Sequence, residues 1–216
     1  VGLPVRREIS RRPQAAARAA LGLESEHRLL VVLGGSQGAA SLNDWARSQL
    51  EFFASEGIQL YVVTGLGKGQ EGTIELKTRT GVPMRAVFAP FCDRMADLMS
   101  AADLVVSRAG AGTLAELIRC ETPAILVPYP QAADNHQQAN AAFFERQGGG
   151  MVIAQTQLAQ LHAEVVDVIF NDWLLRKLRA NLQRMDRANS LDLLLADLEE
   201  LTRGSAPAGQ LGAASA

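Results

Sequence analysis

The chain lacks most of the features that would assign it to a specialised class of protein. Its only two cysteines, Cys92 and Cys120, do not have the Cys-x-x-Cys spacing of a metal or redox site, so we expect two reduced thiols in a cytoplasmic protein. No apolar run reaches the roughly 18 residues of a membrane span, and the first residues do not resemble a signal peptide. A formal net charge of −2 indicates no nucleic-acid partner. No Asp-x-Asp motif that could hold a metal ion occurs.

The hydrophobic pattern predicts an α/β fold. With 48% hydrophobic and 20% charged residues, the 216-residue chain can form one substantial core. Short apolar runs typical of strands span 29–33, 58–63, 84–88, 104–106, 124–127 and 151–153. Amphipathic segments typical of helices span 39–54, 93–100, 113–119 and 135–147, and a helical pattern with breaks near Asn171 and Asn189 spans 157–201. This alternation predicts a Rossmann-like parallel sheet with helices on both faces.

The ends of the chain have a different composition from its middle. The segment 1–12 resembles an interdomain linker and has several arginines, which we assign to a solvated surface. We expect a globular domain over 13–203, with further sequence preceding the linker. The Gly/Ala/Ser-rich segment 204–216 cannot bury much apolar surface, and it is predicted to be a disordered tail.

A glycine-rich turn joins the strand near Val105 to the helix after Gly112. Its sequence is Ser-Arg-Ala-Gly-Ala-Gly-Thr-Leu-Ala-Glu, from Ser107 to Glu116. A helix N-terminus has unpaired N–H groups and a partial positive charge, which suit a phosphate. Glu116 follows about one turn later, where a carboxylate can accept hydrogen bonds from a ribose diol. The two features together predict a site for a nucleotide diphosphate.

Two other glycine clusters follow predicted strands. The segment 34–39 reads Gly-Gly-Ser-Gln-Gly-Ala, which is neither GxGxxG nor a Walker loop. An NAD site would also place a carboxylate at the end of the second strand, and that strand ends in Val63-Thr64-Gly65. A sugar nucleotide is therefore favoured over NAD. The third cluster, 65–69, is interpreted as a mobile surface loop.

A polar segment follows the strand at 124–127. After Pro128-Tyr129-Pro130 it continues from Asp134 to Ala141 as Asp-Asn-His-Gln-Gln-Ala-Asn-Ala. Asp134 is a good N-cap for the next helix, or alternatively a ligand for sugar hydroxyls. The amides can both donate to and accept from a sugar. His136 has no carboxylate partner in the local sequence, so we interpret it as a contact or surface residue rather than a base.

Five segments in this order resemble the C-terminal half of the MurG family of UDP-N-acetylglucosamine transferases. They are Gly2–Arg6, Gly34–Ala39, Phe91–Met95, Ser107–Glu116 and Asp134–Ala141. The resemblance implies a GT-B architecture, in which this chain is the donor-binding domain and the N-terminal acceptor domain is absent. It also implies that no metal or cofactor is needed and that the catalytic base lies in the other domain.

The same resemblance implies individual roles. Arg6, Ser36 and Arg108 would contact or support the diphosphate, although for Arg108 a pairing role within the fold is an equal alternative. The backbone of Cys92 would pair with uracil, and Glu116 would hold the ribose. Backbone N–H groups would hold phosphate and sugar, and Gln137 would contact the GlcNAc hydroxyls together with Asp134 and His136. The backbone groups belong to Ala111, Gly112, Thr113, Leu114 and Ala115.

The implied activity is transfer of GlcNAc from UDP-GlcNAc to lipid I, giving lipid II for peptidoglycan. The protein would then be peripheral on the cytoplasmic face of the bacterial inner membrane. A separately encoded UDP-sugar-binding subunit of a split transferase is one alternative. A UDP-GlcNAc 2-epimerase is a weaker one, because it would need acid and base residues that this chain does not show.

Overall fold

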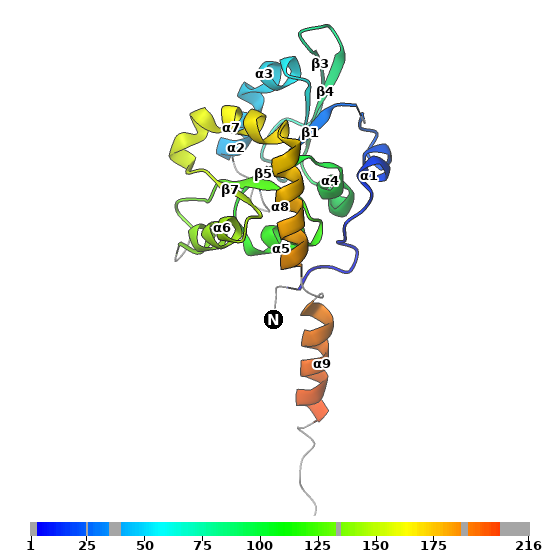
Figure 1. Cartoon of the computed structure of the whole chain (residues 1–216), viewed down its shortest axis with the longest axis vertical. Coiled ribbons are helices and arrows are strands. Elements are labelled where there is room, and N and C mark those ends of the chain that lie inside the picture. Colours follow the sequence, from blue (N-terminus) through cyan, green and yellow to red (C-terminus); the bar gives the residue numbers. More distant parts are fainter. Residues whose placement is uncertain (1–3, 25, 35–39, 133–134, 187–189, 204–216) are drawn as a thin grey trace, which may run out of the picture.

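The computed structural model describes residues 4–24, 26–34, 40–132, 135–186 and 190–203 (Figure 1). Strands and helices alternate along these residues. The strands are β1 (Arg28–Leu33), β2 (Ile58–Val63), β3 (Gly72–Lys77), β4 (Pro83–Ala89), β5 (Leu104–Ser107), β6 (Ala124–Leu126) and β7 (Gly150–Val152). The helices are α1 (Gln14–Ala20), α2 (Ala40–Ser48), α3 (Leu50–Ser55), α4 (Met95–Ala101), α5 (Ala111–Arg119), α6 (His136–Arg146), the 3-10 helix η2 (Gln155–Gln160), α7 (Leu161–Ile169), α8 (Asp172–Met185) and α9 (Ser190–Arg203).

All described strands form one sheet with the order β3-β4-β2-β1-β5-β6-β7. Every neighbouring pair is parallel except β3 with β4, which is antiparallel. The chain builds outward from β1 through β2 to β4 on one side, then returns to the centre and builds outward from β5 to β7 on the other. The order therefore reverses between β1 and β5, and such a switch point is where open parallel sheets bind ligands.

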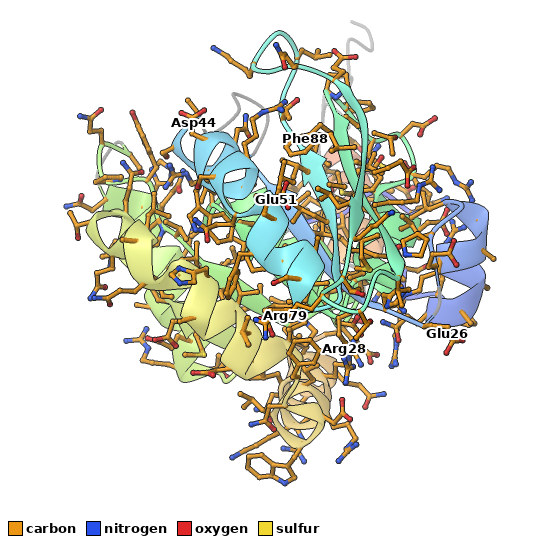
Figure 2. All side chains as sticks on the ribbon, turned by 90° about the horizontal axis from the view of Figure 1, so that it is seen from above. Glu26, Arg28, Asp44, Glu51, Arg79 and Phe88 are labelled. Carbon is orange, nitrogen blue, oxygen red and sulfur yellow. The ribbon has the colours of Figure 1, made fainter. Side chains whose placement is uncertain are left out.

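Helices cover both faces of the sheet, as predicted. On β1, Leu30 and Val32 pack into one core cluster with α2, α3 and α7, whereas Leu29 and Val31 pack into the other cluster with α1, α4, α5 and α6. Successive side chains of a strand point to opposite faces, so a strand that is apolar at every position supplies both cores. Figure 2 shows α2 and α3, which carry Asp44 and Glu51, lying across one face.

The predicted α/β fold is confirmed, and most predicted strands agree with the observed ones within about one residue. The helix expected over 39–54 is two helices, because the backbone leaves helical geometry at Gln49. Two elements were not predicted. β3 is an edge strand whose exposed positions include Glu75 and Lys77, so it lacks the apolar run of a central strand. The other, α1, is short and consists mainly of alanine.

The two ends of the chain differ in what the structure describes. Ile9, in the predicted linker, is only 2% exposed and packs in the core cluster that contains Leu29. α9 extends away from the sheet (Figure 1), and its Leu198 is 56% exposed. The predicted tail at 204–216 lies outside the described residues.

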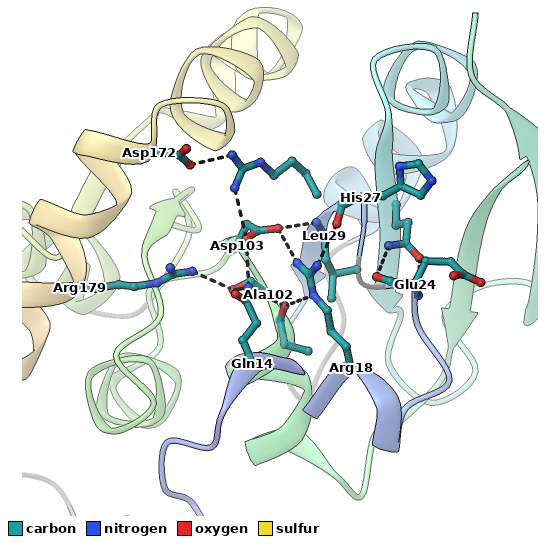
Figure 3. A network of polar contacts seen from close by, with 12 residues as sticks. Gln14, Arg18, Glu24, His27, Leu29, Ala102, Asp103, Asp172 and Arg179 are labelled. Carbon is teal, nitrogen blue, oxygen red and sulfur yellow. Dashed lines mark hydrogen bonds and ion pairs between the residues drawn. The ribbon is translucent and has the colours of Figure 1, made fainter. Parts of the chain in front are cut away.

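A buried polar network closes the amino-terminal edge of the sheet (Figure 3). The carboxylate of Asp103, which precedes β5, accepts hydrogen bonds from Arg18 Nη2 at 2.7 Å and from the backbone N–H of Leu29 at 2.8 Å. It also accepts one from Gln14 Nε2 at 3.0 Å. Arg18 is 6% exposed and donates in addition to the carbonyl of Ala101. One carboxylate thus ties α1, β1 and the start of β5 together.

Replacing Asp103 should destabilise the fold strongly. In Asp103→Asn the Arg18 guanidinium stays buried without a counter-charge, and breaking such a pair costs about 3–5 kcal/mol. Urea unfolding followed by circular dichroism should show a large decrease in the midpoint. The matched control is Asp172→Asn, which removes the exposed partner of Arg28 (2.7 Å). That variant should leave the midpoint nearly unchanged, and equal decreases in the two variants would contradict the role of Asp103.

Candidate functional site

The loops that follow β1, β5 and β6 begin side by side at the carboxyl edge of the sheet. Leu33 and Ser107, the last residues of β1 and β5, are register partners. The N–H of Arg108 donates to the carbonyl of Leu33 at 3.4 Å, and the N–H of Val127 donates to the carbonyl of Ser107 at 2.8 Å. Several glycine-rich and polar segments therefore meet where the strand order reverses.

The first turn of α5 is open toward this edge. Its N-cap, Gly110, is extended (φ −66°, ψ 139°), and no side chain caps the helix. The first N–H groups of a helix have no acceptor within it, so those of Ala111, Gly112 and Thr113 remain available to a ligand. Gly112 is exposed, and a Cβ added there would meet no atom of the described residues outside its own helix backbone within 4 Å. Space and donors are therefore both present for an anion.

Glu116 lies in the next turn of α5, with a side chain that is 25% exposed. Burial raises the pKa of its carboxyl, and the positive charge of Arg6 opposes this rise. Arg6 Nη2 lies 4.0 Å from Glu116 Oε1 and its Nη1 lies 3.4 Å from Glu8. Arg6 and Glu116, which are far apart in the sequence, thus lie beside the same helix N-terminus.

Arg108 points into the fold. It is 7% exposed and donates to the carbonyl of Val127 (2.9 Å), Ser41 Oγ (2.8 Å) and Gln155 Oε1 (2.7 Å). Its guanidinium also lies 5.3 Å from the ring centre of Tyr129, and burial lowers its pKa. Of the two roles expected from the sequence, this geometry favours pairing within the fold.

The start of α6 faces the same edge. The Oε1 of Gln137 accepts the N–H of Tyr129 at 2.9 Å, which fixes the amide and leaves its NH2 group as the donor for a ligand. Asn140 Nδ2 donates to the carbonyl of Ala109 at 3.0 Å, so this helix is tied to the loop before α5. His136 is exposed, and Asn135 adopts a left-handed conformation (φ 52°).

The loop after β4 contributes Phe91 and Cys92. Cys92 is buried, and its thiol contacts the hydroxyl of Tyr61. Burial raises the pKa of Tyr61 to about 12 and also raises that of Cys92, so both groups are protonated at neutral pH. Phe91 is 61% exposed, which is unusual for a large aromatic ring. No role was predicted for Phe91 from the sequence, although its position next to the predicted uracil contact was a usable signal.

Two predicted ligand residues, Ser36 and Asp134, lie outside the described residues. Among the residues that are described, no group of three or more His, Cys, Asp or Glu side chains could hold a metal ion. No described helix is long and apolar enough to cross a membrane. The site therefore consists of a helix N-terminus, a half-buried carboxylate, an oriented amide and an exposed aromatic ring.

Comparison with known proteins shows the family of the chain. Residues 29–191 match the model of the glycosyltransferase family 28 C-terminal domain. The chain belongs to glycosyltransferase family 28. Over its whole length it is 62% identical to a relative from Opitutus terrae, and over 161 residues it is 42% identical to one from Sorangium cellulosum. Both are named UDP-N-acetylglucosamine–N-acetylmuramyl-(pentapeptide) pyrophosphoryl-undecaprenol N-acetylglucosamine transferase. The matches cover 100% and 74% of this chain, but only 57% and 38% of those relatives.

Solved structures support the family 28 fold. The crystal structure of Acinetobacter baumannii MurG superposes with a TM-score of 0.64 at 23% identity, covering 89% of this chain and 55% of that one. The glycosyltransferase of kitacinnamycin gives a TM-score of 0.63 at 22% identity, covering 93% and 47%. These structures confirm the predicted Rossmann-like fold. The family resemblance is confirmed by the family model and the curated relatives.

The raised pKa of Glu116 gives a pH-dependent prediction for stability. The folded chain holds this proton more tightly than the unfolded chain, so ionising the carboxyl costs stability as pH rises through its folded pKa. Glu116→Gln should therefore be more stable than the parent at pH 7, and the difference should vanish below the usual carboxyl pKa of 4.5. Urea midpoints measured from pH 3 to 8 check this. A stability difference that is independent of pH would contradict this prediction. In an Arg6→Ala background the difference between Glu116→Gln and its parent should be larger at pH 7, because Arg6 no longer lowers the pKa of Glu116.

Proposed function

We propose that this chain binds the donor UDP-N-acetylglucosamine and forms the donor-binding part of a family 28 transferase. The observation that carries the proposal is the position of Glu116 one turn beyond the open N-terminus of α5. The helix N-terminus can donate hydrogen bonds to a diphosphate, and the carboxylate one turn later can accept them from the ribose hydroxyls. The two groups therefore match two parts of one nucleotide. The identities of the sugar and of the acceptor are inferred from the names of the relatives.

The diphosphate would lie against the first turn of α5. Backbone N–H groups of Ala111, Gly112 and Thr113 and the helix dipole would stabilise it. The N–H of Leu114, expected from the sequence as a further contact, donates instead to the carbonyl of Gly110 at 3.0 Å, and Ala115 follows it in the same helix. Arg6, which is 56% exposed, can reach the same region because it already lies 4.0 Å from Glu116. Ser36 is proposed as a further phosphate contact. These groups would also stabilise the negative charge that develops on UDP as the glycosidic bond breaks.

The nucleoside would lie between Glu116 and the loop after β4. Glu116 would accept hydrogen bonds from the two ribose hydroxyls, displacing the long contact with Arg6. The backbone of Cys92 would pair with the uracil edge, and the contact of the Cys92 thiol with the Tyr61 hydroxyl would help to position that backbone. Phe91, with its exposed ring, would stack on the base.

The sugar would lie near the start of α6. Because Gln137 already accepts a hydrogen bond from Tyr129, it would donate its NH2 group to the GlcNAc hydroxyls. Asp134 and His136 are proposed as further sugar contacts. Arg108 would act indirectly. It would hold the ends of β5 and β6 together and would not contact the phosphate.

The full protein would transfer GlcNAc to lipid I. The relatives' names specify a pyrophosphoryl-undecaprenol acceptor, and undecaprenol is a long lipid chain that resides in a membrane. We therefore infer a peripheral position on the cytoplasmic face of the inner membrane. Since this chain spans 57% of the Opitutus relative, the acceptor site and the catalytic base are assigned to the remaining part of such a protein.

Glu116→Ala should weaken UDP binding by about tenfold to a hundredfold. A hydrogen bond to a charged group contributes roughly 1.5–3 kcal/mol, which corresponds to about tenfold to a hundredfold in affinity. Isothermal titration calorimetry of the 216-residue chain with UDP measures the effect. Glu75→Ala is the matched control, because it removes an exposed carboxylate from the edge strand β3. Unchanged UDP affinity in Glu116→Ala would refute the ribose assignment.

Gly112→Ala should change stability and binding in opposite directions. A methyl group here meets no described atom within 4 Å, and alanine is favoured over glycine in a helix by about 0.5–1 kcal/mol. The unfolding midpoint should rise or stay level. The methyl group would occupy the space proposed for phosphate, so UDP affinity should fall at least tenfold while uridine affinity falls less. A variant that is more stable and binds UDP normally would place the diphosphate elsewhere.

A further inference from the structure

The third glycine cluster, residues 65–69, lies at the same carboxyl edge of the sheet as the proposed diphosphate site. It follows β2, the neighbour of β1 on the side away from β5. The N–H of Gly34 donates to the carbonyl of Val63 at 3.4 Å, so the loops after β1 and β2 start next to each other. The cluster therefore lies one strand away from the switch point, on the side of β1 that is opposite to β5 and α5.

The structure shows that this cluster is anchored. Asn43, a buried residue of α2 that is 3% exposed, donates from Nδ2 to the carbonyl of Thr64 at 2.9 Å and to that of Lys68 at 3.3 Å. Within the loop, the N–H of Lys68 donates to the carbonyl of Gly65 at 3.2 Å. Gly67 has a φ of 66°, as the third residue of a type II turn requires. The interpretation of 65–69 as a loose surface loop therefore does not account for its contacts.

Anchoring the loop leaves a buried polar atom unsatisfied. The Oδ1 of Asn43 is buried and has no hydrogen-bond partner among the described residues. Such an atom costs folding free energy, and an apolar side chain at this position would avoid the cost. The presence of asparagine at position 43 is therefore better explained by the loop conformation that its Nδ2 stabilises than by a gain in folding stability.

The anchored loop presents an uncompensated positive charge. Lys68 is exposed, and no described carboxylate lies within ion-pair distance of its ammonium group. The neighbouring cation, Arg47, is already engaged, because its guanidinium lies 4.1 Å from the ring centre of Phe88 and donates to the carbonyl of Gln70. Lys68 is thus the cation of this loop that remains available to an anion.

We propose that residues 65–69 form a second diphosphate-binding element, in which Lys68 supplies the positive charge and Asn43 positions the loop. The inference rests on the proposed function for the location of the ligand. The shared chemistry is a diphosphate ester bound across the ends of β1 and β2. Both the UDP donor and a polyprenyl diphosphate acceptor contain this group.

The test compares Lys68→Gln with Lys77→Gln in the 216-residue chain. Lys77 is a suitable control because it pairs with Pro83 at the start of β4, at the opposite edge of the sheet. Calorimetric titrations use UDP, uridine, inorganic pyrophosphate, and geranyl diphosphate added after saturation with UDP. Lys68→Gln should weaken pyrophosphate binding by about threefold to tenfold and leave uridine unchanged, whereas Lys77→Gln should change neither. Lys68→Arg should retain most of the affinity, because it keeps the charge.

The nucleotide titrations separate the two sources of diphosphate. A parallel loss for UDP in Lys68→Gln assigns the loop to the donor. Unchanged UDP affinity with weaker geranyl diphosphate binding assigns it to the second substrate. Equal affinities of Lys68→Gln and Lys77→Gln for all diphosphates would overturn the inference. If the parent chain failed to bind UDP but bound pyrophosphate in a Lys68-dependent way, the proposed function would fail and this inference would stand.

Discussion

The pairing of β1 with β5 is the constraint on which the rest of the structure depends. Because this pair marks the reversal of strand order, it decides which loops meet at the carboxyl edge and which helices lie on each face. The pair is also fixed at its other end, where Asp103 binds the backbone N–H of Leu29 and the buried guanidinium of Arg18. A shift of one strand against the other would break those contacts and move Ser107 away from Leu33.

The carboxylates at the two ends of the parallel strands differ in how completely they are paired. At the amino-terminal edge, the carboxylate of Asp103 accepts several hydrogen bonds and has an arginine as counter-ion, as a buried charge requires. At the carboxyl edge, Glu116 is half-buried with an arginine only at 4.0 Å, and α5 begins without a side-chain cap. The first arrangement is complete without a ligand, whereas the second leaves a carboxylate and helix N–H groups that a ligand could engage. This contrast supports the proposed role of Glu116.

Much of the fold could be predicted from the sequence because the central strands are apolar at every position. β1 and β5 need no tertiary information to be recognised as buried strands. β3 could not be recognised in this way, because an edge strand is held by its hydrogen bonds to β4 rather than by burial. Candidate site residues could be proposed from the sequence where their chemistry follows from local order, as for Gly112 and Glu116. The site could not be predicted where it depends on contacts between distant segments, as in the contact of Tyr61 with Cys92 or the anchoring of Lys68 by Asn43.

Arg108 shows why residue type alone does not identify a phosphate ligand. An arginine in a glycine-rich turn is typical of a phosphate ligand. The guanidinium of Arg108, however, already donates hydrogen bonds to Val127, Ser41 and Gln155. Withdrawing it from there would leave buried acceptors unpaired, at a cost comparable to what a phosphate contact would return. The positive charge for the proposed diphosphate must then come from groups that are accessible to a ligand. The N–H groups of α5 and the exposed Lys68 meet this condition, and so does Arg6, whose side chain is 56% exposed although it lies near Glu8 and Glu116.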